Sequence, residues 1–248
     1  MKVEKPLVSI IMPAYNVEDN ILGVLEMVKR VMADINYEVI VVNDCSTDGT
    51  RRMLEEFRNG YVKVVDHVVN LGKGAAVKTG VKHAEGEYVI ILDADGDIDA
   101  GNIKRYIEAL KKYDVVIGSK RHPHSTYQAP LLRKMLSLGF NALVNILLGV
   151  RVSDTQTGFK AFKAKHLKMI MKAIVVKRYS WDAEVLALAN LLKLKIAEAP
   201  VHIRQERLFK MRDALRMLLE LLGIVYRLRM IRWYQRNIGK ENQNINYS

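Results

Sequence analysis

Short β-rich runs alternate with helical patterns through the first half of the chain, and this alternation constrains the fold more than any other feature. The helical segments carry apolar residues three and four positions apart, and short loops separate them from the runs. Such alternation favours a right-handed parallel α/β sheet. The expected strands are Leu7–Met12, Tyr37–Val42, Val62–Val65, Tyr88–Leu92 and Val115–Gly118. The expected helices are Asn20–Asp34, Thr47–Asn59, Ala75–Ala84 and Asn102–Lys112.

After Ser119 the pattern changes, and two apolar-rich helices are expected. The first is Ala129–Leu148, and the second, which is amphipathic, runs from Leu208 to Trp233. Polar residues interrupt both, whereas a membrane span needs roughly 20 predominantly apolar residues. Two arrangements stay open: the helices lie in a membrane interface, or they pack on each other or on the sheet. The remaining segments are expected to be a polar loop, Arg151–Gly158, a strand, Phe159–Lys163, a helix, Ser180–Leu192, and a strand, Leu194–Ile203.

The chain is strongly basic, with a formal net charge of +12 at pH 7, and this implies an anionic partner. From Arg204 to Arg236, nine Lys or Arg residues stand against three Asp or Glu, interleaved with Leu and Met. Few aromatic residues are placed for base stacking, so a phosphorylated substrate or a membrane surface is favoured over nucleic acid. The one cysteine, Cys45, rules out an intramolecular disulfide and suits a reducing compartment. The N-terminus lacks a signal-peptide core.

Three carboxylates follow a strongly apolar run at every second position. The run is Val89–Leu92, and the carboxylates are Asp93, Asp95 and Asp97. A buried strand that ends in this way delivers oxygen ligands to the rim of an α/β sheet, where a divalent cation can be shared with phosphates. The EF-hand, Walker A and Rossmann patterns are excluded, because the positions that define them hold other residues.

Polar loops follow each of the first four expected strands. Because the carboxyl ends of parallel strands meet at one edge of a sheet, these loops should converge on one crevice. Together they offer pieces suited to a base, a ribose, a phosphate and a metal, which specifies a nucleotide-diphosphate ligand. The loops are Pro13–Asn16, Asn43–Thr50, Asn70–Ala76 and Asp93–Asp97.

With these motifs the chain resembles the family 2 glycosyltransferases over nearly its whole length. The resemblance implies an α/β, GT-A nucleotide-diphospho-sugar transferase fold, with a mostly parallel central sheet flanked by helices and with C-terminal amphipathic helices. It also implies Mg²⁺ or Mn²⁺ at Asp93, Asp95 and Asp97, and catalytic roles for Asp95, Arg121 and Lys210. The residues implied for nucleotide binding are Pro13, Ala14, Tyr15, Glu18, Asp44, Lys73, Asp93 and Ala94.

Motifs in the second half are similar to those of dolichyl-phosphate glucose and mannose synthases. These motifs are Asp154–Lys160, Trp181–Leu186 and Ile196–Val201. The resemblance implies inverting transfer of a hexose from a nucleotide-diphospho-sugar, with UDP-glucose favoured, to a polyprenyl or dolichyl phosphate. The acceptor phosphate is already anionic near pH 7, so no general base is needed. The residues implied for that phosphate are Lys120, Arg121, Arg204 and Lys210, and those of the acceptor or sugar loop are Asp154, Gln156 and Thr157.

The chain departs from the family pattern at several positions. Val17 stands where Glu usually follows Tyr-Asn, and Asn43 replaces the first of two aspartates. Several alternatives therefore stay open: GDP-mannose or another donor, a non-lipid acceptor, or a non-catalytic protein that binds a nucleotide sugar or a membrane surface. The intact Asp93 and Asp95 favour the enzyme.

The expected organisation is one catalytic domain followed by a membrane-interface segment. The domain covers residues 1–203 and includes the apolar interface helix 129–148; an amphipathic interface helix then covers 204–240 and a flexible tail 241–248. The expected location is cytoplasmic, peripheral on the cytoplasmic face of a membrane. Homodimerisation through the apolar helices is an open alternative.

Overall fold

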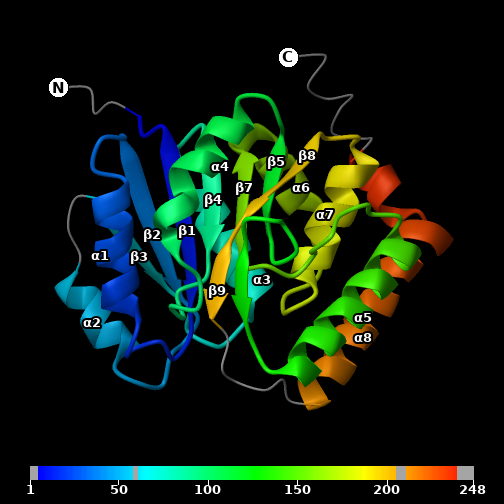
Figure 1. The fold of residues 1–248 in the computed structure, drawn as a ribbon, viewed down its shortest axis with the longest axis horizontal. Helices are drawn as coiled ribbons and strands as arrows, with labels where there is room; N and C mark the ends of the chain where they lie inside the picture. Colours follow the sequence, from blue (N-terminus) through cyan, green and yellow to red (C-terminus); the bar gives the residue numbers. More distant parts are fainter. Residues whose placement is uncertain (1–4, 58–60, 205–210, 239–248) are drawn as a thin grey trace.

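The central feature of the fold is a seven-stranded sheet with helices on both faces (Figure 1). A computed structural model describes residues 5–57, 61–204 and 211–238. The strands are ordered β3-β2-β1-β4-β7-β5-β8, and every pairing is parallel except the two made by β7. The strands of this sheet are β1 (Val8–Ala14), β2 (Tyr37–Asn43), β3 (Val62–Asp66), β4 (Tyr88–Leu92), β5 (Val115–Ser119), β7 (Phe159–Lys163) and β8 (Ile196–Pro200).

Side chains alternate between the two faces of each strand, which gives the protein two apolar cores. In β1, Ile10 and Met12 join the core beneath α1 and α4, whereas Ile11 joins the core beneath α3, α6 and α7. The expected mostly parallel sheet flanked by helices is therefore confirmed. The helices of this domain are α1 (Ile21–Val31), α2 (Thr50–Glu56), α3 (Lys73–His83), α4 (Ile103–Leu110), α5 (Leu131–Leu148), α6 (Ala164–Ala173) and α7 (Trp181–Leu191), with a 3₁₀ turn at Ala100–Asn102.

The second half differs from the sequence-based expectation in three places. Helix α6 was not expected, and neither was the strand β6 (Thr126–Gln128). The single strand expected over Leu194–Ile203 is two strands, because the chain leaves the large sheet after β8 and β9 (His202–Arg204) then pairs with β6.

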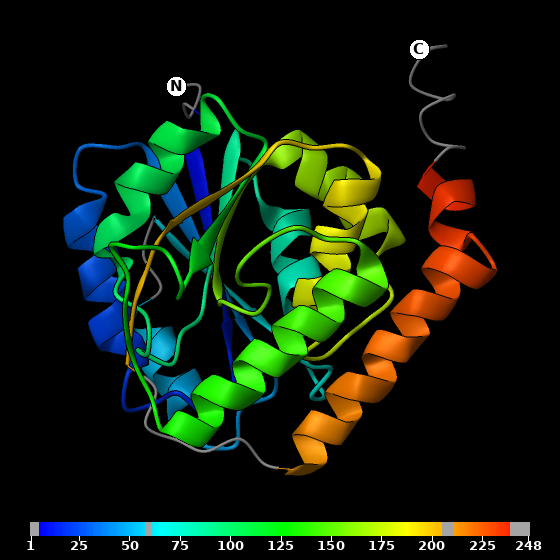
Figure 2. The same cartoon turned by 45° about the vertical axis from the view of Figure 1, so that its right-hand side comes forward.

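The two apolar helices lie side by side along one flank of the domain (Figures 1 and 2). The second, α8 (Met211–Val225), continues as a π-helical turn, Tyr226–Met230, and breaks before the helical residues 233–238. The long helix expected from Leu208 to Trp233 is thus helical as far as Met230 and wrong at residues 231–232, and its first three residues, including Lys210, lie outside the described residues.

Both helices keep large apolar side chains in contact with solvent. In the described part of the chain, α5 is the helix long and apolar enough to cross a membrane by length and composition, and only 17% of it is buried. The inner side of α5 is fixed to the domain by Asn141, whose side chain donates to the carbonyls of Val152 and Ser153. The exposed apolar residues of the two helices are Leu131, Leu132, Met135, Leu136, Leu138, Ile146, Leu215, Leu218, Leu219, Leu222, Tyr226 and Met230.

Candidate active site

The loops that follow β1 to β4 are joined to one another by hydrogen bonds. The side chain of Asn16 accepts from the Thr47 N–H at 2.8 Å and donates to its hydroxyl at 3.2 Å. The Lys73 ammonium lies 2.7 Å from one Asp93 carboxylate oxygen and 2.8 Å from the other. The carboxylate of Asp44 joins the second loop to the third, so all four segments meet at the carboxyl edge of the sheet.

Asp44 is a buried hub that organises the loop before α3. Its carboxylate accepts the N–H groups of Leu71 at 2.9 Å and Gly72 at 2.7 Å. A ring nitrogen of His67 lies 2.7 Å from the same carboxylate, and the other ring nitrogen lies 2.9 Å from the hydroxyl of Thr79. Both carboxylate oxygens are thus engaged within the protein, and Asp44 shapes the loop that presents Lys73. Its direct contact with a nucleotide stays a prediction.

Gly72 and Gly74, on either side of Lys73, lie too close to the backbone of residues 176–177 to carry a side chain. A Cβ on Gly72 would lie 2.6 Å from the Lys177 carbonyl, and φ there is +97°. A Cβ on Gly74 would lie 2.7 Å from the Val176 carbonyl. Only glycine lets the start of α3 approach this segment so closely, so the two residues fix the position from which Lys73 reaches the carboxylates.

The acidic cluster after β4 contains two aspartates whose pKa values are raised, Asp93 and Asp95. Burial, together with the neighbouring Asp95, raises the pKa of Asp93 to about 6, even though Lys73 pulls it down. Partial desolvation by neighbouring protein atoms and the nearby Asp97 carboxylate likewise raise the pKa of Asp95, whose side chain still reaches solvent. Although burial opposes it, the carboxylates of Asp182 and Asp93 raise the pKa of Lys73, which keeps this side chain cationic. Crowded carboxylates with raised pKa values form a site that a cation would stabilise.

The residues present fit a divalent metal held jointly with a ligand. Among the described residues, no three His, Cys, Asp or Glu side chains converge in a way that could hold an ion by themselves. Mg²⁺ is commonly bound by one or two carboxylates and completed by substrate phosphates and water. Asp95 is exposed at the rim, where it could serve in this way, and its side chain accepts the Asp97 N–H at 3.1 Å.

The expected acceptor loop lies beside the expected phosphate-binding lysine. Asp154 is buried and lies 3.2 Å from the Lys120 ammonium, and it also accepts the hydroxyl of Thr157 at 2.7 Å. Burial lowers the pKa of Lys120 despite this partner. The Arg121 guanidinium donates to the Ser153 carbonyl. Lys120 is therefore committed to Asp154, and its role in binding an acceptor phosphate stays a prediction.

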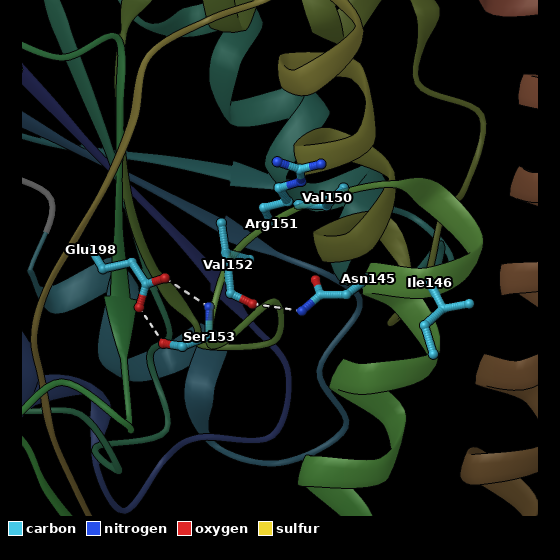
Figure 3. Close-up of a pocket in the computed structure, with 7 residues that line it drawn as sticks. All are labelled: Asn145, Ile146, Val150, Arg151, Val152, Ser153 and Glu198. Atoms are coloured by element: carbon cyan, nitrogen blue, oxygen red, sulfur yellow. Dashed lines mark hydrogen bonds between the residues drawn. The ribbon is translucent and has the colours of Figure 1, made fainter.

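A cavity of about 460 Å³ opens between the end of α5 and β8, next to this loop (Figure 3). Figure 3 shows the Glu198 carboxylate accepting from the backbone N–H and the hydroxyl of Ser153, while the Asn145 side chain donates to the Val152 carbonyl. Glu198 thereby fixes the residue that precedes Asp154. The cavity is lined by Asn145, Ile146, Val150, Arg151, Val152, Ser153 and Glu198.

A cationic group at the start of α5 was not foreseen as part of the site. The ring centroid of Tyr127 lies 5.5 Å from the Lys120 ammonium and 5.6 Å from the Lys134 ammonium. Burial raises the pKa of the Tyr127 hydroxyl, and the nearby positive charge of Arg133 opposes this shift. The clustering of the charges of α5 at Arg133 and Lys134 was a usable signal in the sequence, whereas Tyr127 belongs to no recognisable motif.

The other expected site residues occupy the same edge of the sheet. The Arg204 N–H donates to the Asp97 carbonyl at 3.0 Å, which places the end of β9 beside the acidic cluster. The Glu18 carboxylate accepts the Gly49 N–H at 2.5 Å. Pro13 and Ala14 end β1, Tyr15 is half exposed beyond them, Ala94 is buried, and the Gln156 N–H donates to Asp154.

A known family of transferases matches this arrangement of strands, loops and carboxylates. The model of the family described as "Glycosyl transferase family 2" matches residues 9–171, and the chain belongs to this family. The chain is 36% identical to dolichyl-phosphate beta-glucosyltransferase ALG5A of Trichomonas vaginalis, over 78% of this chain and 64% of that protein. It is 33% identical to ALG5D of the same organism, over 91% and 75%, and 31% identical to the human dolichyl-phosphate beta-glucosyltransferase, over 78% and 66%. The chain thus spans less than two thirds of the first and third of these relatives.

Solved structures share the fold. Glucosyl-3-phosphoglycerate synthase from Mycobacterium tuberculosis, in complex with Mn²⁺, UDP and glucosyl-3-phosphoglycerate, superposes with a TM-score of 0.67 at 18% identity. The match covers 89% of this chain and 79% of that one. The expected GT-A fold is confirmed.

Proposed function

We propose that this glycosyltransferase moves glucose from UDP-glucose to a dolichyl or polyprenyl phosphate and produces a β-linked lipid-phosphate sugar. The observation that carries the proposal is the short path from the donor-type crevice to the helices that expose large apolar side chains. Asp182 lies 3.7 Å from Lys73, and Ser180, two residues earlier, donates to the Met217 carbonyl of α8. The relatives named dolichyl-phosphate beta-glucosyltransferase support this choice of acceptor and sugar.

The donor half of the crevice suits a nucleotide diphosphate with a divalent metal. Lys73 starts α3, whose positive dipole end adds to the attraction for phosphate. Asp93 and Asp95 would bind Mg²⁺ or Mn²⁺, and Asp97 would complete the cluster. When bound, the metal would neutralise the charge that develops on the departing nucleotide diphosphate. The side chain of Lys73 would contribute to the same task, which is electrostatic.

The acceptor would approach from the flank formed by α5 and α8. A polyprenyl phosphate is anchored in a bilayer, so its head group can be reached only by an enzyme at the membrane surface. The exposed apolar residues of α5 and α8 would lie in the interface, with Arg216, Arg229 and Arg232 near the headgroups. Because Asn141 and Asn145 bond the inner side of α5 to the segment Val152–Ser153, an interfacial position fits better than a span. The protein would then be peripheral, on the cytoplasmic face.

The acceptor phosphate would serve as the nucleophile. Its second pKa is about 6, so it carries its charge near pH 7 and needs no general base. Arg121, Arg204 and Lys210 would hold it in line with the anomeric carbon, and Lys210 lies outside the described residues. Attack from the side opposite the leaving nucleotide inverts an α-linked donor to a β-linked product.

The experiment is transfer of radiolabelled hexose to dolichyl phosphate in detergent with Mn²⁺, from UDP-glucose and separately from GDP-mannose. Label in the organic phase from UDP-glucose alone, abolished by EDTA and by Asp95→Ala, is the expected result. Label from GDP-mannose alone would show that the donor is GDP-mannose and not UDP-glucose. Absence of labelled lipid product from both donors would refute dolichyl phosphate as the acceptor.

A further inference from the structure

Lys160 is a fully buried lysine at the centre of the sheet. It lies on β7 opposite Ile91 of β4 and Ile117 of β5, and its exposed fraction is 0%. Its ammonium donates to the Thr157 carbonyl and to one carboxylate oxygen of Asp182, both at 2.5 Å. Lysine is almost never fully buried unless it is paired, and here the partner is the second residue of α7.

Asp182 divides its carboxylate between two lysines. One oxygen accepts from Lys160, and the other lies 3.7 Å from the ammonium of Lys73. Lys73 in turn contacts Asp93. Four alternating charges therefore run from the centre of the sheet to the acidic cluster, in the order Lys160, Asp182, Lys73, Asp93.

Stability of the fold alone does not explain this arrangement. Burying two charges is costly, and apolar side chains of similar size in the same place are often as stable or more stable. Asp182 is also a poor candidate for a general base, since Lys160 holds one of its two oxygens inside the protein. The pair is better understood through Lys73, the one member of the row that both faces the crevice and carries a positive charge.

We propose that Lys160 and Asp182 are positioning residues that hold Lys73 in the crevice for the diphosphate of the donor. This inference rests on the proposed function, because it presumes that a nucleotide diphosphate binds beside Asp93. When Asp93 turns to the metal or the nucleotide, Lys73 loses its nearest partner. Asp182 then keeps the ammonium in place, and Lys160 offsets the charge of Asp182 so that it does not repel the diphosphate.

The pair also connects the donor side to the acceptor loop. Lys160 donates to the carbonyl of Thr157, and the next residue, Gly158, accepts the backbone N–H of Asp93 at 3.2 Å. A displacement of Asp182 would therefore alter the positions of residues in both the donor half and the acceptor half of the crevice.

The test removes the pair without leaving a buried charge. In Lys160→Met/Asp182→Leu both partners become apolar, so the protein should fold, whereas either single change would leave one charge unpaired. Binding of UDP and of UMP, each with Mn²⁺, is measured by calorimetry. UMP lacks the second phosphate that Lys73 would meet. We expect about a tenfold loss of UDP affinity and unchanged UMP affinity. In a Lys73→Met background the double substitution should cause no further loss.

A control comes from the same strand. Lys163, which lies 3.0 Å from Asp114, can be replaced together with it as Lys163→Met/Asp114→Leu, and UDP affinity should not change. Wild-type UDP affinity in Lys160→Met/Asp182→Leu would overturn the inference, as would equal losses for UDP and UMP or a further loss in the Lys73→Met background. If the wild-type chain bound neither UDP nor GDP with Mn²⁺, the proposed donor would fail and the inference with it.

Discussion

Gly158 should be essential for the donor site, because the side chain of Asp93 occupies the space where a Cβ would be. A Cβ built on Gly158 lies 1.8 Å from one Asp93 carboxylate oxygen and 2.3 Å from its carboxyl carbon. Ordinary contact begins at 3.4 Å, so in Gly158→Ala the carboxylate must retreat by roughly 1.6 Å. Gly158 is not among the glycines with positive φ, so the backbone itself tolerates alanine.

The expected cost follows from the geometry of the ion pair. A retreat of that size separates Asp93 from Lys73, whose contacts are now 2.7 and 2.8 Å. A displacement of about 1 Å at a reacting site can cost about 100-fold in rate, which corresponds to ~2.7 kcal/mol of activation free energy. We therefore expect Gly158→Ala to lower kcat/KM for UDP-glucose about 100-fold and to weaken Mn²⁺-dependent UDP binding.

The assay is hexose transfer to dolichyl phosphate, with UDP binding measured in parallel. Gly23→Ala in α1 is the matched control, since a Cβ there meets nothing within 4 Å. Transfer by Gly158→Ala within about threefold of wild type, in a protein of unchanged melting temperature, would refute the reasoning, because threefold is only ~0.65 kcal/mol.

Three further predictions concern pH, stability and the membrane. The folded-state pKa of Asp93 is raised, so without a cation its ionisation destabilises the fold as pH rises from about 4 to about 6. Because the metal is expected to bind jointly with the donor phosphates, Mn²⁺ affinity is measured in the presence of UDP; it should fall below pH 6, and a flat profile from pH 5 to 7.5 would contradict this. Tyr234→Phe removes the hydroxyl that donates to buried Glu184 and should lower the free energy of unfolding by ~1–3 kcal/mol in denaturant titrations. Leu132→Asp, at a side chain that is 59% exposed, should reduce cosedimentation with anionic vesicles severalfold, while binding equal to wild type would exclude α5 from the interface.

The strands and the donor loops were largely predictable because their signals are local. An apolar run such as Tyr88–Leu92 carries its own evidence, and the order of loops after parallel strands fixes where they meet. Helix α6 also had a local signal, with Leu167, Ile170 and Met171 at helical spacing, and was nevertheless missed. The three-residue strand β6 had none, since it exists only through its pairing with β9.

Other parts of the site depend on contacts that no local pattern encodes. The commitment of Lys120 to Asp154 requires two loops to meet across 34 positions. The pair of Lys160 and Asp182 likewise depends on a contact between distant positions, since β7 and α7 must meet across 22 residues. The π-helical turn at Tyr226–Met230 precedes Tyr234, whose hydroxyl bonds to buried Glu184, and an amphipathic sequence pattern cannot reveal it.

The reversed direction of β7 divides the sheet into two parts whose sequences can change independently during evolution. On one side, β1 to β4 and their loops carry the residues assigned to the donor; on the other, β7, β5 and β8 frame the loops assigned to the acceptor. Because β7 runs against its neighbours, the connection that precedes it enters at the same rim as the donor loops. Insertions or deletions between α5 and β7 could therefore remodel acceptor choice without changing the register of the donor strands. Lineages within such a family could exchange acceptors while retaining one sugar donor.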